Sequence, residues 1–240
     1  MLDRLLDIVW PRTCEVCRRP VDRPGRYLCS DCVMRLPFTP VDGLCRRCGR
    51  AAAGLDGEFL CEDCRCHRPL YDRAASVFRL ENDARDLVNA FKFRDRVHLK
   101  SDFADFLEGL ARVRFRLSEV ACIVPMPSTT PHRWLRGYNQ CAILASALSK
   151  RVGIPCRVLL KRVGNPARQG GLSEEDRRVN VVGTFAALRN ASAFAGRTVL
   201  VVDDIMTTGS TLSEAAKTLK SAGVGKVWAL TVARSLRELL

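Results

Sequence analysis

Two adjacent carboxylates and a group of hydroxyls follow one apolar run near the carboxyl end of the chain. The run "TVLVV" at 198–202 leads directly into Asp203 and Asp204. Four hydroxyl residues and a glycine follow closely: Thr207, Thr208, Gly209, Ser210 and Thr211. A glycine-containing turn exposes consecutive backbone N–H groups, and a helix N-terminus behind it attracts anions. Segment 207–211, called the phosphate turn below, is therefore predicted to bind a monophosphate.

The two carboxylates suit a different part of the same ligand. Asp203 and Asp204 would repel a phosphate, but they can accept hydrogen bonds from the vicinal hydroxyls of a ribose. Acids followed by hydroxyls thus predict a sugar that has a 5′-phosphate. In the alternative interpretation, Asp204 only caps the following turn. The chain has no G-x-x-x-x-G-K-[ST] segment, which argues against a nucleotide-triphosphate P-loop.

The amino-terminal part of the chain is rich in cysteine pairs. "YLCSDC" (27–32) and "FLCEDC" (59–64) are copies of an internal repeat. Two Cys-x-x-Cys turns together complete a tetrahedral Zn²⁺ site with no open position. Taken in sequential order, the pairs predict two sites, formed by Cys14, Cys17, Cys29 and Cys32 and by Cys45, Cys48, Cys61 and Cys64. Interleaved pairing, the first pair with the third, is the alternative.

Disulfides and redox chemistry are competing interpretations of these pairs. Disulfides are rare in a reducing cytosol, and the sequence has no sign of export. Thiol exchange does not need four tandem copies of Cys-x-x-Cys. Cys66 and His67 are spare ligand candidates. A small module with few large apolar side chains would gain its folding free energy from metal, so we expect two structural zinc ions.

After residue 70 apolar runs alternate with helical patterns. Strands are predicted at 75–79, 121–125, 156–160, 181–186, 198–203 and 226–232, and helices at 82–93, 101–113, 138–151 and 210–222. This alternation predicts an α/β fold, with a mostly parallel sheet and helices on both faces. Ligands of such sheets bind beyond the carboxyl ends of the strands, where Asp203 and Asp204 fall.

Composition limits the classes of protein that the chain can represent. It has 240 residues, of which 47% are hydrophobic, and no apolar run long enough to span a membrane. Because "MLDRLLDIVWP" does not look like a secretory signal, we expect a cytoplasmic protein. The formal charge is +13, and segment 128–180 has ten basic but only three acidic residues. This local excess favours an anionic ligand, either phosphates or nucleic acid.

The motifs together resemble a known family. "VLVVDDIMTTGST" looks like the motif that binds 5-phosphoribosyl 1-pyrophosphate (PRPP) in type I phosphoribosyltransferases. "VLVVDD" also resembles response-regulator receivers, but only 36 residues follow Asp204, too few to complete that domain. "IVPMPS", "RWLRGYNQCAILASALS", "LVNAFKFRDR" and "RQGGLSEEDRRVNVVGTF" are similar to segments of the competence protein F (ComF) family. The tandem cysteine pairs match the double zinc ribbon common at the N-terminus of that family.

The resemblance implies a domain order and a role for particular residues. It implies a double zinc ribbon at 13–68 and a type I phosphoribosyltransferase-like domain at 69–240, and the helical spacing of Leu2, Leu5, Leu6 and Val9 predicts an N-terminal helix at 1–12 before them. Asp203 and Asp204 would hold the ribose hydroxyls, and the phosphate turn would hold the 5′-phosphate. The pyrophosphate loop would comprise Pro125, Met126, Pro127 and Ser128.

Two further segments match the family. The family motif corresponds to Arg136, Gly137, Tyr138, Asn139 and Gln140. In the alternative interpretation, Asn139 and Gln140 are only capping and surface residues at the start of a helix. Segment 161–178 occupies the position of a mobile loop that closes over the pyrophosphate. Its candidate catalytic residues are Lys161, Arg162 and Arg168.

The family resemblance also implies a reaction and partners. The reaction would be a PRPP-dependent glycosyl transfer to an unknown acceptor, with release of pyrophosphate. Mg²⁺ would be held mainly by oxygens of the ligand. The family is linked to DNA uptake and natural transformation, so single-stranded DNA and a competence helicase or other uptake proteins are candidate partners, without membrane insertion. The alternative is a non-catalytic adaptor that binds single-stranded DNA and uses the PRPP fold as a ligand sensor.

Overall fold

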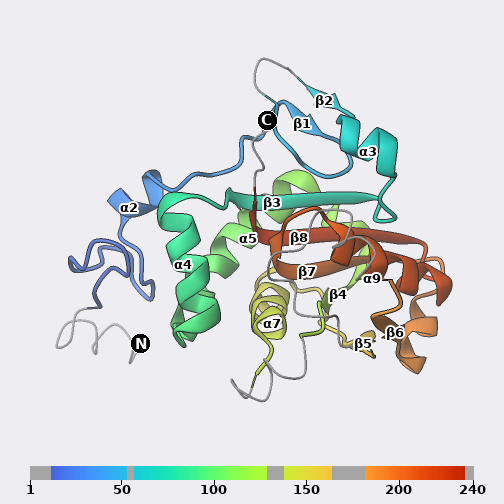
Figure 1. The fold of residues 1–240 in the computed structure, drawn as a ribbon. Coiled ribbons are helices and arrows are strands. Elements are labelled where there is room, and N and C mark those ends of the chain that lie inside the picture. The colour runs from blue at the N-terminus through green and yellow to red at the C-terminus, as the bar shows by residue number, and fades with distance from the viewer. Residues whose placement is uncertain (1–11, 53–56, 129–137, 164–181, 236–240) are drawn as a thin grey trace.

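The computed structural model describes residues 12–52, 57–128, 138–163 and 182–235. Almost all of the helix predicted at 1–12 lies outside this range. The described part contains one four-stranded sheet with helices around it, and two cysteine-rich segments that lie at different edges of this body (Figure 1).

The main sheet is entirely parallel. It consists of β3 (Arg73–Arg79), β4 (Val120–Pro125), β7 (Thr198–Met206) and β8 (Lys226–Arg234), in the order β3-β8-β7-β4. The two central strands are rich in valine, leucine and alanine and are buried along most of their length. Such near-continuous apolar runs are typical of parallel strands covered on both faces.

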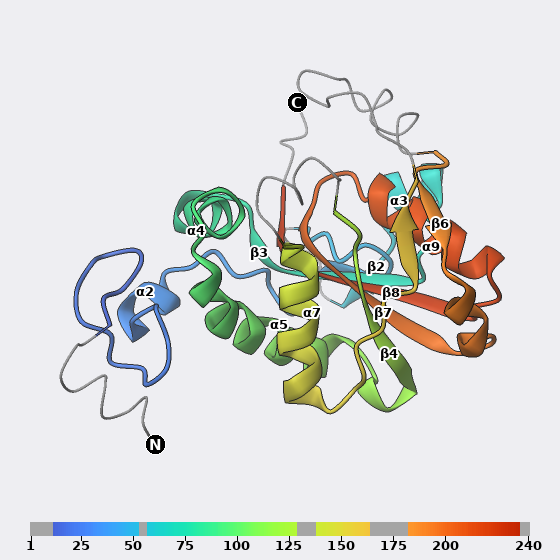
Figure 2. The ribbon, with the colours of Figure 1, turned by 90° about the horizontal axis from the view of Figure 1, so that it is seen from below.

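Alternate residues of β7 pack against different layers. Leu200 and Val202 belong to the core shared with α4 (Asn82–Phe93), α5 (Lys100–Arg114) and α7 (Gln140–Val152). Val199 and Val201 belong to the core shared with α9 (Ser210–Ser221). Figure 2 shows α4, α5 and α7 on one side of the sheet and α9 on the other. The predicted parallel sheet with helices on both faces is therefore confirmed.

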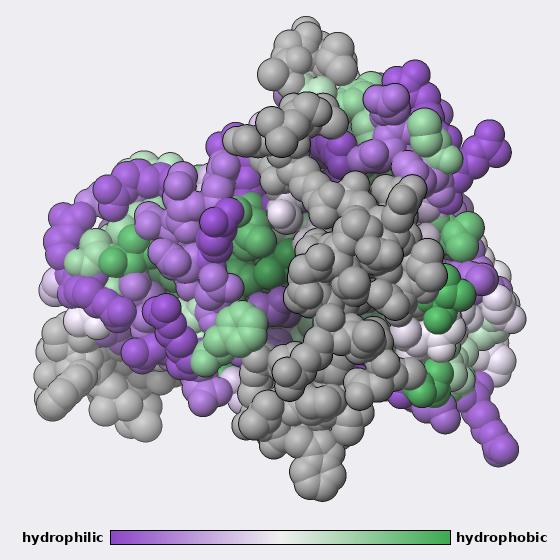
Figure 3. Space-filling model, in the orientation of Figure 1, coloured by the Kyte–Doolittle hydropathy of each residue, from purple (hydrophilic) through white to green (hydrophobic). Residues whose placement is uncertain are grey.

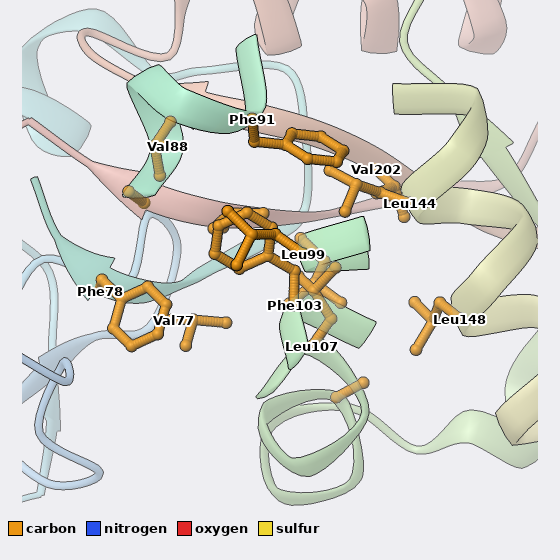
Figure 4. Close-up of a cluster of buried hydrophobic side chains, with 14 of the residues drawn as sticks. Val77, Phe78, Val88, Phe91, Leu99, Phe103, Leu107, Leu144, Leu148 and Val202 are labelled. Atoms are coloured by element: carbon orange, nitrogen blue, oxygen red, sulfur yellow. The ribbon is translucent and has the colours of Figure 1, made fainter. Parts of the chain in front are cut away.

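The larger core is formed by side chains from three helices and the sheet. Phe91 of α4 and Phe103 of α5 meet edge to face, with ring centroids 5.4 Å apart. Leu144 of α7 and Val202 of β7 lie beside them (Figure 4). In α4 the buried residues recur at helical spacing, because Ala84, Leu87, Val88 and Phe91 share one face. This contact fixes the end of α4 against the end of β7.

Two predicted strands do not join the main sheet. The prediction placed strands at 156–160 and 181–186, whereas the structure has β5 (Leu160–Arg162) and β6 (Phe185–Ala187), which pair with each other antiparallel. Cys156 makes only one isolated bridge to Ile123 of the edge strand β4. A short apolar run does not reveal its pairing partner, which explains the error.

The cysteine segments repeat one local structure. Helix α2 (Ser30–Met34) begins directly after Cys29, and α3 (Glu62–His67) begins directly after Cys61. The second copy also contains β1 (Leu44–Cys45) and β2 (Glu58–Phe59). Figure 1 shows α2 beside α4, whereas β1, β2 and α3 lie above β3. Three short 3₁₀ helices complete the described elements: η1 (Val97–Leu99), η2 (Leu117–Glu119) and η3 (Arg189–Phe194).

The described surface is mostly hydrophilic on the face drawn in Figure 3, over the first cysteine segment, α4 and the β1–α3 segment. None of the helices in the described ranges combines the length and the apolar character that crossing a membrane requires.

Candidate functional site

Asp203 and Asp204 lie near the carboxyl end of β7, next to the start of the phosphate turn. Oδ1 of Asp203 accepts a hydrogen bond from the backbone N–H of Asp204, and Oδ1 of Asp204 accepts one from the N–H of Ile205. Within the described residues, every hydrogen bond to these carboxylates goes to an Oδ1 atom. The Oδ2 atoms are the ones left to accept hydrogen bonds from a ligand.

A lysine from α4 reaches the second carboxylate. Nζ of Lys92 lies 2.9 Å from Oδ1 of Asp204. Both side chains are mostly buried, with 21% of Lys92 and 15% of Asp204 exposed. Burial acts to lower the pKa of Lys92, but the carboxylate of Asp204 outweighs it and raises this pKa above its ordinary value. The ammonium group therefore stays charged beside the carboxylate pair.

The first carboxylate is the more buried of the two. Burial and the negative charge of Asp204 raise the pKa of Asp203 to about 6, against the opposing effect of Lys92. The Sγ of Cys141, in α7, donates a hydrogen bond to Oδ1 of Asp203 over 3.3 Å. Burial and the same carboxylates raise the pKa of this thiol well above its usual value, so Cys141 remains protonated and acts as a donor.

The phosphate turn has the geometry expected of an anion site. Gly209 adopts a left-handed conformation, with φ +80°, and is the N-cap of α9. The Oγ1 of Thr208 and the Oγ of Ser210 are 2.7 Å apart and hydrogen-bonded. The first N–H groups of a helix have no intrahelical acceptors, so this turn offers donors at the positive end of the α9 dipole. Thr207 is exposed, and Thr211 is half-buried.

The start of α7 connects three segments around the site. Oδ1 of Asn139 caps the helix by accepting from the N–H of Cys141, and its Nδ2 donates to the carbonyl oxygen of Met126. Gln140 is buried and donates from Nε2 to the carbonyl oxygen of Lys92. Asn139 is thus a cap that also positions the loop after β4, and Gln140 is not a surface residue.

The remainder of the family motif is only partly described. The hydroxyl of Tyr138 donates to Oδ1 of Asp95, just beyond the end of α4. Arg136 and Gly137 lie outside the described residues. The described residues of this motif therefore fasten α7 to the end of α4, which is the helix that contains Lys92.

The loop that follows β4 lies beside β7. Pro125 pairs with Val202, and the N–H of Met126 donates to the carbonyl oxygen of Val202 over 2.9 Å. Met126 is buried, whereas Pro127 and Ser128 are half-buried. Loop 125–128 and the two carboxylates therefore emerge from neighbouring strands at the same edge of the sheet.

The three candidate catalytic residues have different surroundings. Lys161 is exposed on β5, and Arg168 lies outside the described residues. Arg162 stacks over the ring of Phe185 at 5.4 Å, and its buried Nε has no hydrogen-bond partner in the described structure. Burial lowers the pKa of Arg162, and the carboxylate of Asp203 acts in the opposite direction. Among the candidates in the described residues, Arg162 is therefore the one whose pKa is affected by the charge of Asp203.

The eight cysteines of the four pairs form two clusters. Cys14, Cys17, Cys29 and Cys32 form the first cysteine cluster, and Cys45, Cys48, Cys61 and Cys64 form the second. The pairs thus combine in sequential order, and Cys66 is exposed outside both clusters.

The cluster geometry fits structural zinc. In each cluster all four Sγ atoms lie within 4.8 Å of one another. Cys17 and Cys29 have their sulfurs 3.7 Å apart, and so do Cys48 and Cys61. Tetrahedral zinc with Zn–S bonds of about 2.3 Å requires sulfurs about 3.8 Å apart, whereas a disulfide requires about 2 Å. Four thiolates in such a set leave no position for a substrate.

Backbone groups support both clusters in the same way. The N–H of Cys29 donates to the Sγ of Cys14, and the N–H of Cys61 donates to the Sγ of Cys45, over 3.5 and 3.4 Å respectively. Such hydrogen bonds stabilise thiolates that are bound to a metal. The internal repeat in the sequence thus gives the four cysteines of each cluster the same arrangement and the same backbone support.

Known proteins match both parts of the chain. Residues 139–238 match the family model described as "Phosphoribosyl transferase domain", and residues 5–65 match the one described as "Double zinc ribbon domain". "Competence protein F" of Haemophilus influenzae is 30% identical over 229 residues, which is 92% of this chain and 96% of that protein. The chain belongs to the competence protein F (ComF) family.

Other relatives of this ComF-family chain have related names. "DNA utilization protein YhgH" of Escherichia coli K12 is 30% identical over 232 residues, covering 94% of this chain and 98% of the relative. "Competence protein ComFC" of Bacillus subtilis is 27% identical over 222 residues, covering 89% of this chain and 86% of the relative. Among solved structures, glutamine phosphoribosylpyrophosphate amidotransferase of B. subtilis matches at 18% identity and a TM-score of 0.40, over 60% of this chain and 30% of that one.

Sequence reasoning missed one candidate residue of this ComF-family site. Lys92 lies within "LVNAFKFRDR", which was recognised only as a segment similar to the family. Its pairing with Asp204 depends on the packing of α4 beside the end of β7. A lone lysine in an amphipathic helix is usually solvated, so the only signal available in the sequence was the family resemblance of the segment.

Proposed function

We propose that the protein binds PRPP with Mg²⁺ at the carboxyl end of β7 and transfers its phosphoribosyl group to an acceptor with release of pyrophosphate. One observation supports this proposal above the others. The carboxylates of Asp203 and Asp204 lie directly before a glycine turn at the N-terminus of α9. Acceptors for sugar hydroxyls and donors for a phosphate thus follow one another in the chain, in the order that a phosphoribosyl group requires.

In this proposal each half of the site holds one part of the ligand. The Oδ2 atoms of Asp203 and Asp204 accept hydrogen bonds from the ribose hydroxyls. The phosphate turn, 207–211, donates backbone N–H and hydroxyl groups to the 5′-phosphate. Lys92 reduces the negative charge of the carboxylate pair, which lets both acids remain close to an anionic ligand.

The pyrophosphate end of the ligand would lie between loop 125–128 and β5. Arg162 is half-buried near Asp203, and its Nε has no partner among the described residues, so its guanidinium can donate to an anion. Lys161 is exposed, so its ammonium group would contact the pyrophosphate only if that group extends outward from the site. Arg168 lies outside the described residues and stays a candidate from the sequence.

Magnesium fits this site mainly as part of the ligand. The carboxylates of Asp203 and Asp204 lie near the Cys141 sulfur, but a protonated thiol is a poor ligand for Mg²⁺, and Lys92 already pairs with Asp204. We therefore propose that pyrophosphate and ribose oxygens provide most of its ligands. When bound, the ion would neutralise charge on the leaving pyrophosphate.

The residues of the chain would then act on the charges that develop during the reaction. The bond between the ribose C1 and the pyrophosphate oxygen breaks, and the pyrophosphate leaves with the electron pair. The buried carboxylates stabilise the positive charge that develops on the ribose, and Arg162 stabilises the leaving anion. The acceptor forms the new bond to C1 and loses its proton.

Titration calorimetry with PRPP tests binding, and pyrophosphate release across a panel of bases and amines tests turnover. We expect PRPP to bind with Mg²⁺ and at least one acceptor to give steady release. A protein that binds neither PRPP nor ribose 5-phosphate would contradict the proposal. Binding without release from any acceptor would favour a non-catalytic adaptor that uses the PRPP fold as a ligand sensor.

The names of the relatives support a proposal for the cellular role. Their names, "Competence protein F" and "DNA utilization protein YhgH", support a proposal that this chain serves DNA uptake in the cytoplasm. A competence helicase or other uptake proteins are the partners proposed for it. The two cysteine clusters would hold structural zinc and take no direct part in the chemistry.

The second candidate function is a non-catalytic adaptor that binds single-stranded DNA. It is favoured by the basic excess of segment 128–180, much of which lies outside the described residues. Affinity for a single-stranded oligonucleotide should fall steeply as salt rises, because each neutralised phosphate releases counterions. Replacing Arg162, Arg168, Arg177 and Arg178 together should flatten this dependence. An unchanged slope would place the polyanion site elsewhere.

A further inference from the structure

The second cysteine cluster and the phosphate turn line the same cavity. The cavity has a volume of about 240 Å³, and its walls include Cys48 and Cys64 of the cluster and Gly209 and Ser210 of the turn. Helix α3, which contains Cys64, and helix α9, which follows Gly209, are far apart in the chain but meet at this cavity. The first cysteine cluster has no residue in its lining.

Arg234 connects the second cysteine cluster to the base of the turn. It is the last residue of β8 and is only 4% exposed. Its Nη1 donates to the carbonyl oxygen of Cys48 and lies 4.0 Å from the Sδ of Met206, the last residue of β7. A buried guanidinium depends on its acceptors, so a shift of Cys48 would disturb Arg234 and, with it, Met206.

Tyr71 and Met206 lie directly under the phosphate turn. A Cβ atom placed on Gly209 would come within 2.8 Å of the Tyr71 hydroxyl and 2.7 Å of the Met206 Cε. Tyr71 is 1% exposed, lines the cavity and packs in the same core cluster as the four sulfurs. Because Gly209 must keep φ near +80°, this close contact helps to set the conformation of the turn.

The second cluster is also fixed to the sheet. Gly49 follows Cys48, and a Cβ atom on it would lie 2.6 Å from the carbonyl oxygen of Ala74 in β3. The N–H of Ala74 in turn donates to the carbonyl oxygen of Arg47. Movement of this cluster therefore cannot be absorbed by a loose linker, because its backbone packs on β3 next to Tyr71.

The first cysteine cluster provides a matched contrast. Its segment attaches to α5, where Arg26 donates from Nη2 to Oδ1 of Asp105 over 3.0 Å, and the N–H of Tyr27 donates to Asp102. Its cysteines pack in the core on the opposite face of the sheet from α9. Arginines thus tie both cysteine segments to the main body, and among the residues that the structure describes Arg234 is the one that joins a cluster to the base of the phosphate turn.

We propose that the second cysteine cluster positions the phosphate turn through Arg234 and Tyr71, so that metal at this cluster and a phosphoribosyl ligand at the turn bind cooperatively. The cooperative binding of a phosphoribosyl ligand rests on the proposed function, whereas the positioning of the turn by the cluster does not. Coupling between two sites is reciprocal, so the ligand must also slow the loss of metal from the second cluster. The first cluster should show no such coupling.

Amide hydrogen exchange tests the positioning half without any ligand. Arg234→Met removes the donor to Cys48, whereas Arg234→Lys keeps one donor and should preserve most of the protection. We expect at least tenfold faster exchange at residues 207–212 in Arg234→Met. Arg26→Met, the matched control at the first cluster, should accelerate exchange around α5 and leave 207–212 unchanged. Equal exchange at 207–212 in Arg234→Met and the parent protein would overturn the proposal.

Zinc release tests the reciprocal half. With a chromophoric chelator, the metal-loaded parent should release zinc in two phases, and ribose 5-phosphate should slow only one of them, by severalfold. Cys14→Ser, which keeps the second cluster, should retain the slowed phase. Equal slowing of both phases, or of neither when the ligand binds, would overturn the coupling. If ribose 5-phosphate does not bind the parent at all, the proposed function fails, and the exchange measurement still decides whether Arg234 holds the turn.

Discussion

Lys92 in α4 and Asp204 at the end of β7 form an ion pair, with Nζ and Oδ1 2.9 Å apart. The pair fastens a helix to the strand end where the candidate ligand site lies. It also places one positive charge next to two adjacent carboxylates, of which Asp203 is buried. Without this charge, the carboxylates would repel each other and any anionic ligand more strongly.

Replacing Lys92 by methionine should therefore destabilise the protein. The mostly buried carboxylate of Asp204 would lose its counter-charge, and we expect the free energy of unfolding to fall by about 1–3 kcal/mol. Urea denaturation of zinc-loaded protein measures this change. The double variant Lys92→Met with Asp204→Asn should recover part of the loss, because it removes the unpaired charge as well. If the single and double variants are equally unstable, the ion pair does not account for the effect.

Asp203 should make stability depend on pH. Its pKa is raised to about 6 by burial and by Asp204, whereas an aspartate in an unfolded chain titrates near about 4. Between these values the folded state binds more protons than the unfolded state, so stability falls as pH rises through this window. Above pH of about 6 the whole penalty applies.

Asp203→Asn removes this penalty, because a neutral amide does not titrate. The stability of the variant relative to the parent should therefore rise between pH 5 and pH 7.5. Urea midpoints of both proteins at the two pH values provide the measurement, and any effect of pH on the cysteine clusters is common to both. A difference between the proteins that stays constant with pH would show that Asp203 ionises in the folded state as it does in the unfolded chain.

The two cysteine clusters predict two zinc ions per chain. Metal analysis of protein purified without added zinc should give a ratio near two, and one zinc or none, with disulfides instead, would contradict the prediction. Cys14→Ser should lose one ion and unfold the first cysteine segment, because that segment has little apolar core of its own. Cys66→Ser is the matched control and should keep both ions, since Cys66 is exposed outside the clusters.

Local patterns in the sequence were enough to predict most helices and the central strands. The helix predicted at 82–93 coincides with α4, since its apolar residues recur along one face. The strand predicted at 198–203 is β7, and the acids fall near its carboxyl end as expected. The cysteine pairs also indicated both clusters, although only the structure distinguishes sequential from interleaved grouping.

Contacts between distant segments could not be predicted in this way. The pairing of β5 with β6, the approach of Lys92 to Asp204 and the contact of Arg234 with Cys48 each depend on tertiary packing. Hydrophobic periodicity gives the buried face of an element but not its neighbour. The buried environment of Asp203 has the same origin, because it arises from Cys141 and Lys92 on two different helices.

The central claim is that the carboxylates bind the sugar and the turn binds the phosphate. Thr208→Ala with Ser210→Ala should weaken binding of PRPP, ribose 5-phosphate and inorganic phosphate alike, because the turn contacts the phosphate of each ligand. This variant tests the phosphate half of the site, and it serves as the reference for the test of the two carboxylates.

The most direct test is calorimetry of the double variant Asp203→Asn with Asp204→Asn, titrated with the same three ligands. A charge-assisted hydrogen bond contributes roughly 1.5–3 kcal/mol, so PRPP and ribose 5-phosphate should bind at least about tenfold more weakly. Inorganic phosphate, which has no sugar, should change much less. If the double variant binds PRPP as tightly as the parent does, the carboxylates are structural caps, and the assignment of the sugar site is wrong.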